Sequence, residues 1–318
     1  MSLVAGGTMS PPARRSRPTR LRIGASQIEA WAYVLPALGL FLLFELYPIL
    51  ANLWASVSHP HAAPSLARYA EAASDPVFWV AVRNSVVWVV VSIALEIAIG
   101  FPLAVLIELA IPRGRAWFRT LLFLPMVVTP SVIALVFTTI YAPDYGLLYG
   151  LFQALGLANS FPAVLGEPAF ATYAVIVVNV WQWCGFFVLM YCVGIAQLDA
   201  EILDAAAIDG AVGLARVRYV IWPMLRSTHV SLVVLGTIQA LQQFPLIYLM
   251  TQGGPANASQ TLATYIFQTG FDENRMGFAS TVAVVLFVLA LVLVAVEYAI
   301  ADNWLARLPL ARTRGRAA

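Results

Sequence analysis

The chain has 318 residues, of which 61% are hydrophobic and 11% are charged, and its formal net charge is +2. Soluble domains are about half apolar and about a quarter charged, so this composition excludes an ordinary water-soluble fold. The small net charge argues against a nucleic-acid partner. All 18 basic residues are Arg, which excludes a P-loop and Schiff-base chemistry in this chain because both require Lys.

The first residues, up to Arg22, are rich in Pro, Ser and Arg and lack the apolar core of a signal peptide. We therefore predict a disordered cytoplasmic tail over residues 1–27. Residues 28–304 contain all the long apolar blocks and are predicted to form one transmembrane domain. Residues 305–318 are predicted to form a second cytoplasmic tail.

Six apolar blocks are each long enough to cross a hydrocarbon core, which takes about 20 helical residues. Stretches such as residues 86–91 are apolar on every side, which favours helices over the alternating strands of a membrane barrel. The sequence therefore predicts an all-α polytopic membrane protein surrounded by lipid. The predicted spans are residues 32–53, 85–109, 120–141, 170–198, 231–249 and 278–300.

The Arg residues are unevenly distributed among the segments that connect these spans. Fifteen of the 18 lie before the first span, between spans two and three, between spans four and five, or after the last; the other three are Arg68, Arg83 and Arg275. Cytoplasmic segments carry the excess of Arg, so both termini are predicted to lie in the cytoplasm. The protein is thus expected to be a multi-pass protein of the cytoplasmic (inner) membrane.

Residues 199–212, between spans four and five, form a polar and small-residue segment that we call the coupling segment. Acidic residues near its start and Gly210 near its end predict a short amphipathic helix. Ile202, Ala205 and Ala206 share one face of that helix, a small surface suited to a groove on another protein. A solvated helix on the membrane surface is the alternative.

The spacing of this segment resembles a known motif. Asp204-Ala205-Ala206, then Gly210, then Val220-Ile221-Trp222-Pro223 is similar to the EAA loop of binding-protein-dependent ABC importer permeases, although Asp204 replaces the usual Glu and Trp222 a common Leu. In that family the loop docks on an ATPase subunit. The resemblance implies that the coupling residues are Asp204, Ala205, Ala206, Asp209, Gly210 and Pro223.

Further motifs are similar to the sugar-permease branch of this family, which includes the larger maltose permease subunit and the glycerol-phosphate permease subunit. They are Tyr33 to Ala37, Asp75 to Trp79, and Leu249 to Pro255. The resemblance implies the type I importer permease (MetI-like) fold and a non-catalytic subunit that imports a carbohydrate or related polar solute by alternating access. It also implies a second homologous permease, two ATPase subunits that hold ATP and Mg²⁺, and an extracytoplasmic solute-binding protein, with no cofactor or metal in this chain.

The candidate solute pathway lies in spans four and five, where polar side chains interrupt apolar sequence. Such side chains normally face the bundle interior or a cavity. Amides and aromatic rings suit neutral, hydroxyl-rich ligands. Hydrogen bonding between helices is the alternative interpretation. The predicted pathway residues are Gln182, Phe186, Gln239 and Gln243, of which Gln243 resembles a sugar-contacting position of the maltose system.

A secondary transporter driven by an ion gradient is a second hypothesis. It would require paired acidic residues near the bilayer midplane and an inverted repeat. Glu96 is a single deep acidic residue, and no repeat is evident. A membrane-embedded enzyme lacks the clusters of His, Cys or paired carboxylates that catalysis requires, so no catalytic residue is predicted.

Overall fold

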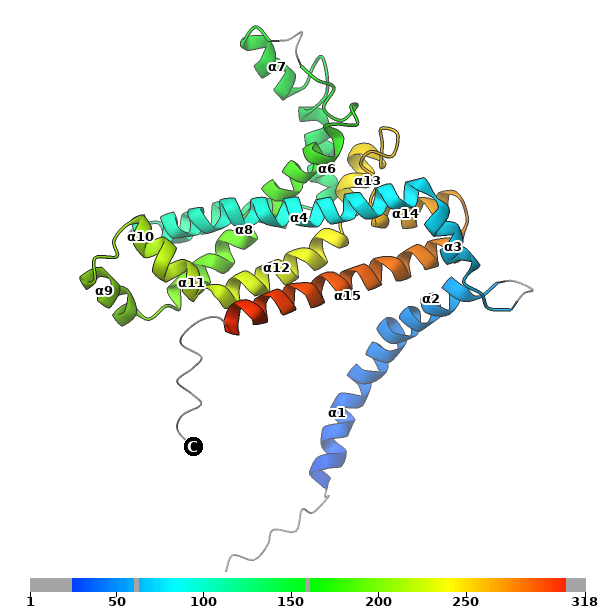
Figure 1. Cartoon of the computed structure of the whole chain (residues 1–318), viewed down its shortest axis with the longest axis horizontal. Helices are drawn as coiled ribbons and strands as arrows, with labels where there is room; N and C mark the ends of the chain where they lie inside the picture. Colours follow the sequence, from blue (N-terminus) through cyan, green and yellow to red (C-terminus); the bar gives the residue numbers. More distant parts are fainter. Residues whose placement is uncertain (1–24, 60–62, 112, 158–160, 307–318) are drawn as a thin grey trace, which may run out of the picture. The chain divides into compact units, whose positions relative to one another are not determined.

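The computed structural model describes residues 25–59, 63–111, 113–157 and 161–306, and their regular elements are helices (Figure 1). It divides into two units, residues 1–51 and 52–318, which are described separately. Most of both predicted tails, residues 1–24 and 307–318, lies outside the described residues. Helix α1 begins at Ala25, within the range predicted as the first tail, and α15 ends at Ala306.

The first unit is a single apolar helix. It contains α1 (Ala25–Phe41), the π-helical turn η1 (Leu42–Leu46) and the start of α2 (Tyr47–Val57). All side chains from Trp31 to Ala51 are exposed, and Phe44 is 69% exposed. Residues Trp31–Val57 are long and apolar enough to cross a membrane. A helix that is apolar all round and buries nothing in its own unit is suited to lipid or to another protein.

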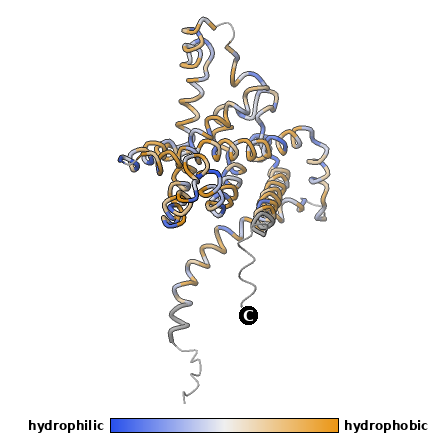
Figure 2. Tube along the Cα trace, turned by 60° about the vertical axis from the view of Figure 1, so that its left-hand side comes forward, coloured by the Kyte–Doolittle hydropathy of each residue, from blue (hydrophilic) through white to orange (hydrophobic). Residues whose placement is uncertain are grey.

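The second unit is built around four long helices that run alongside one another (Figure 1). They are α4 (Pro76–Val105), which continues as η2 (Leu106–Ala110), α8 (Ala171–Ala196), α12 (Arg226–Leu241) and α15 (Met276–Ala306). Apolar residues make up much of the helical trace in Figure 2, as expected where lipid surrounds the bundle. Helix α4 begins where Asp75 accepts a 2.8 Å hydrogen bond from the Val77 N–H and Pro76 occupies the first turn.

Two predicted spans are broken rather than continuous. The third consists of α5 (Arg115–Val127) and α6 (Pro130–Ile140), bent by 91°, and the fifth of α12 and α13 (Pro245–Thr251), bent by 43°. Each second half begins at a proline, which has no backbone N–H to continue the preceding helix, and Thr129 before Pro130 is extended. The described chain has four helices that can each cross a membrane, or up to six spans if each bent pair is one.

Glycine allows the central helices to approach closely. A Cβ on Gly185 of α8 would lie 1.9 Å from the Leu122 carbonyl oxygen of α5, and one on Gly100 of α4 would lie 2.9 Å from the Phe187 Cβ. No side chain fits at Gly185 unless the backbone moves. Helices α4 and α5 are therefore both packed tightly against α8.

Shorter helices connect the long ones at the two ends of the bundle. At the end near α15's start, the Asn84 side chain donates to the carbonyls of Ala258 (2.7 Å) and Gln260 (2.9 Å). The Tyr265 hydroxyl donates to the Asp75 carboxylate, and burial, followed by this bond, raises the pKa of Tyr265 above its usual value. These contacts fasten the loops to α4. The connecting helices are α3 (Ala67–Ser74), α7 (Leu147–Ala154), α9 (Ala200–Ile208), α10 (Leu214–Arg216), η4 (Val217–Ile221), α11 (Trp222–Met224), α14 (Leu262–Phe267) and η5 (Gln268–Asp272).

Candidate functional site

The coupling segment forms a short helix with defined ends. Helix α9 spans Ala200–Ile208, and the Asp199 carboxylate accepts a 2.9 Å hydrogen bond from the Glu201 N–H at its start. Gly210 adopts a left-handed conformation, with φ of +83°, and ends the helix. Only glycine adopts this backbone without a steric cost.

This helix projects from the bundle and buries nothing (Figure 1). Of the predicted coupling residues, Asp204, Ala205, Asp209 and Gly210 are exposed, whereas Ala206 and Pro223 are half-buried. Large apolar side chains lie in the same loop, with Ile208 87% exposed and Leu214 80% exposed. An exposed surface of small, acidic and apolar side chains can contact a partner protein with little rearrangement.

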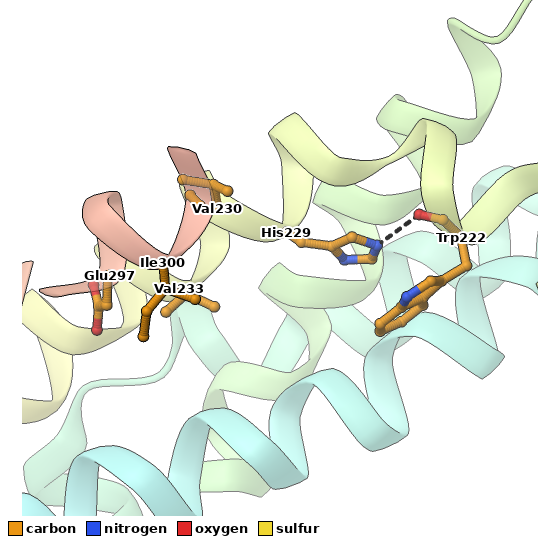
Figure 3. A pocket seen from close by; sticks show the side chains of 7 residues that line it. Trp222, His229, Val230, Val233, Glu297 and Ile300 are labelled. Atoms are coloured by element: carbon orange, nitrogen blue, oxygen red, sulfur yellow. Dashed lines mark hydrogen bonds between the residues drawn. The ribbon is translucent and has the colours of Figure 1, made fainter. Parts of the chain in front are cut away.

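The loop returns to the bundle at Trp222, where a histidine holds it in place (Figure 3). The Nε2 atom of His229 lies 3.0 Å from the Trp222 carbonyl, and Nδ1 lies 2.8 Å from the Tyr191 hydroxyl. A carbonyl can only accept, so Nε2 carries the proton and Nδ1 accepts from Tyr191. The rings of His229 and Trp222 also pack together, with centroids 4.0 Å apart. His229 thus links Trp222, at the end of the loop that contains α9, to α8.

A cavity of about 430 Å³ lies beside this histidine, between α12 and α15 (Figure 3). Its wall is mostly hydrocarbon. The Glu297 carboxylate, which also lines it, accepts a 2.5 Å hydrogen bond from the Thr237 hydroxyl. This cavity lacks the set of polar groups that would recognise a hydroxyl-rich solute. It is lined by Trp222, His229, Val230, Val233, Glu297, Ile300 and Ala301.

A second cavity, also of about 430 Å³, contains most of the predicted pathway residues and is called the pathway cavity. Phe186, Gln239 and Gln243 line it, and so do Trp183 and Gln242. None of the described residues that line it is charged. The remaining lining residues are Met126, Pro130, Phe187, Leu235, Gly236 and Ile238.

Gln182, the fourth predicted pathway residue, has a different position. It is 2% exposed and is not among the residues that line the pathway cavity. Its Nε2 donates a 3.2 Å hydrogen bond to the Val128 carbonyl, at the break before Pro130. A carbonyl released by a helix break needs a donor, and the Gln182 amide provides one.

Two amides of the cavity wall and one that does not line it form a connected group that we call the amide cluster: Gln239, Gln243 and Asn179. The Asn179 Oδ1 accepts from the Gln243 Nε2 at 2.7 Å and from the Gln239 Nε2 at 3.3 Å. Asn179 is fully buried and Gln243 is 6% exposed. The cluster joins α8 to α12 at the point where α12 ends and the chain bends toward α13. Asn179 could be recognised in the sequence as a polar residue in an apolar span, but its role as the hub depends on the three-dimensional packing.

Known proteins with similar sequences and structures agree on one family. Residues 100–306 match the model of the family described as the binding-protein-dependent transport system inner membrane component. The chain is 35% identical to the probable ABC transporter permease protein YurN of Bacillus subtilis over 278 residues, covering 85% of this chain and 95% of that protein. It is 30% identical to the lactose transport system permease protein LacF of Rhizobium radiobacter, covering 84% of this chain and 91% of that protein.

The fold also matches a solved structure, a bacterial ABC transporter involved in the import of the acidic polysaccharide alginate. The TM-score is 0.79 at 20% sequence identity, over 87% of this chain and 96% of that one. These similarities confirm the predicted fold and give no support to the secondary-transporter hypothesis. The chain belongs to the binding-protein-dependent transport system inner membrane component family and is a membrane-spanning permease subunit of an ABC importer.

Proposed function

We propose that this permease subunit transports a neutral carbohydrate and that the solute passes along the pathway cavity. The main support is the chemistry of that cavity, in which the Gln239 and Gln243 amides lie beside the Trp183 and Phe186 rings. Amides exchange hydrogen bonds with hydroxyl groups, and aromatic rings cover the apolar face of a sugar. The absence of charge among the described lining residues disfavours phosphorylated and acidic solutes. The relative LacF carries lactose in its name, which agrees with this class.

In this proposal the remaining parts of the importer are partner proteins. A second homologous permease completes the pathway, two ATPase subunits bind ATP and Mg²⁺, and an extracytoplasmic binding protein delivers the solute. The permease itself is non-catalytic, and both its termini and α9 lie on the cytoplasmic side. The exposed surface around Asp204, Asp209 and Ile208 docks on an ATPase subunit. Closure of the ATPase dimer moves α9 and opens the bundle outward, and hydrolysis returns it to the inward-open state.

The solute class is tested by transport in proteoliposomes that contain the complete importer with its binding protein. The probes are radiolabelled lactose and maltose, compared with sn-glycerol 3-phosphate and alginate oligosaccharides. We expect ATP-dependent uptake of a neutral disaccharide and none of the two anionic solutes. Uptake of an anionic solute alone would contradict the proposal.

The pathway is tested by Gln243→Ala, assayed with the disaccharide that the wild-type complex imports. Loss of one hydrogen bond to the solute, about 1 kcal/mol, is expected to raise the KM for uptake about 5-fold to 10-fold. The matched control is Gln153→Ala, because Gln153 is an exposed glutamine on α7. An unchanged KM in Gln243→Ala would remove Gln243 from the pathway.

The docking surface is tested at Gly210. We expect Gly210→Trp to lower transport per ATP hydrolysed at least several-fold, because the indole occupies the surface that meets the ATPase. Gly210→Asn is the control, since Asn tolerates the left-handed backbone and adds little bulk. If Gly210→Trp transports with wild-type coupling, the loop does not dock as proposed. Equal defects in both variants would indicate backbone strain rather than blocked docking.

A further inference from the structure

Glu96 is a carboxyl group deep in the bundle that the solute pathway does not itself use. It lies in the middle of α4, is 1% exposed, and is absent from the wall of the pathway cavity. An acidic side chain at this depth is costly and normally serves a function. Its Oε1 lies 3.2 Å from the Asn179 Nδ2, whereas Oε2 has no hydrogen-bond partner in the described part of the chain. Glu96 is therefore directly bonded to the hub of the amide cluster.

The bond to Glu96 determines which way the Asn179 amide faces. A side-chain amide has a donor end and an acceptor end, and the acceptor oxygen of a carboxyl group selects the donor end. Asn179 consequently turns its Nδ2 toward Glu96 and its Oδ1 toward α12, where that oxygen receives the Nε2 groups of Gln239 and Gln243. One acceptor on α4 thus fixes a chain of hydrogen bonds that runs across α8 to α12.

The same series of hydrogen bonds orients the two glutamines. Each uses a donor to reach Asn179, so each keeps its carbonyl oxygen available, and neither oxygen accepts a hydrogen bond from the described residues. If Asn179 were turned over, its Nδ2 would face the glutamines and engage their carbonyl oxygens. The glutamines would then offer N–H groups to the cavity in place of acceptors. The orientation of the Asn179 amide therefore decides whether the two glutamines present acceptors or donors to the cavity.

We propose that Glu96 is a positioning residue for transport: through Asn179 it holds the amides of Gln239 and Gln243 so that their carbonyl oxygens accept hydrogen bonds from the hydroxyl groups of the solute. This inference rests on the proposed function and states which partner donates: the solute donates its hydroxyl hydrogens and the glutamines accept them. Two acceptor oxygens in the wall of the pathway cavity favour solutes rich in hydroxyl donors. It disfavours phosphate and carboxylate groups, which can only accept.

The orientation of the two glutamine amides can be released and then restored by exchanging the acid and the amide between positions 96 and 179. Glu96→Gln keeps the size of the side chain and loses no bond at Oε2, but its amide can face Asn179 with either end. We expect the KM for disaccharide uptake to rise about 3-fold to 10-fold, the effect of a partly lost hydrogen-bond pattern, while Vmax and transport per ATP stay near wild type. Asn179→Asp alone places two carboxyl groups together and is expected to abolish uptake.

The double variant Glu96→Gln with Asn179→Asp is the decisive measurement. The carboxylate that it introduces at position 179 can only accept, so it must receive donors from position 96 and from both glutamines. The bond between positions 96 and 179 is thereby reversed, but both glutamines again donate to position 179, as they do in the wild type. We expect its KM to return to within about 2-fold of wild type. A role limited to packing predicts instead that Glu96→Gln is silent and that the double variant is as defective as Asn179→Asp; that result would overturn the inference.

The assay also separates this inference from the function on which it rests. The probes are the same radiolabelled lactose and maltose, with Gln243→Ala measured in parallel. If Gln243→Ala raises the KM but the exchange at positions 96 and 179 does not rescue transport, the role of Glu96 alone is wrong. If the wild-type complex imports neither sugar, or Gln243→Ala leaves the KM unchanged, the proposed pathway fails and the role of Glu96 fails with it.

Discussion

The coupling segment and the amide cluster place their polar side chains in opposite environments: those of the segment are exposed, and those of the cluster are mostly buried. Helix α9 buries no side chain, and Ile208 is 87% exposed, whereas Asn179 is fully buried and its side-chain amide is satisfied by three other residues. A surface left uncovered at the end of a bundle is available to a partner. A buried group of hydrogen-bonded side chains links helices within the subunit itself. The comparison predicts that changes to tight packing or charge pairing in the bundle lower the stability of the subunit, whereas changes on α9 leave its stability unaltered and affect contact with a partner.

The largest effect is expected from Gly185→Leu. The new side chain would meet the Leu122 carbonyl oxygen, since even a Cβ would lie 1.9 Å from that atom. Helices α5 and α8 cannot separate without opening the bundle, so we expect no folded subunit in detergent extracts, measured by size-exclusion chromatography. Gly150→Leu is the control because no atom lies within 4 Å of a Cβ at Gly150. Recovery of a stable Gly185→Leu subunit would show that these helices are loosely packed.

A smaller effect is expected from Arg119→Ala. The Arg119 Nε donates to the Glu108 carboxylate at 3.0 Å, and the Glu108 side chain is 5% exposed. Removing Arg119 takes the nearer of two cations from the buried Glu108 carboxylate, and because the Arg119 side chain is 31% exposed, the loss should be smaller than for a fully buried ion pair. We expect a lower Tm for the purified subunit. Arg115→Ala is the matched comparison: its guanidinium lies 3.8 Å from Glu108 and its side chain is 43% exposed, so its Tm should change less. Equal decreases in Tm for the two variants would mean that Arg119 does not stabilise the Glu108 carboxylate more than Arg115 does.

The smallest effect on stability is expected from Ile208→Ser. An exposed position away from packed neighbours usually changes the free energy of unfolding by less than about 0.5 kcal/mol. The Tm of the isolated subunit should therefore stay at the wild-type value. In the full complex, the same change removes an apolar contact from the proposed docking surface and should weaken capture of the ATPase subunits in pull-down assays. A lowered Tm with normal ATPase binding would show that Ile208 stabilises the subunit and does not contact the ATPase.

The sequence was informative where each pattern depends on neighbouring residues. Apolar blocks predicted the spans, and the α9 segment followed from its capping residues and Gly210, since both signals are local. The 91° bend at Pro130 was harder, because proline marks a possible break but packing determines the angle. Gln182 illustrates the remaining difficulty: its spacing placed it with the pathway residues, whereas the structure pairs it with the Val128 carbonyl. Pairings across helices are not encoded in the spacing along one helix.

The His229 contact near the end of the loop that contains α9 allows a displacement of this loop to tilt α8. His229 connects Trp222 to Tyr191, and Tyr191 lies 12 residues along α8 from Asn179, about 18 Å at the usual helical rise. A tilt of about 3° about one end of such an arm displaces the other by about 1 Å. The bonds at Asn179, 2.7 to 3.3 Å long, cannot stretch by that amount and survive. A displacement of this size at the loop would thus be sufficient to break the hydrogen bonds of the amide cluster at the other end of the helical segment.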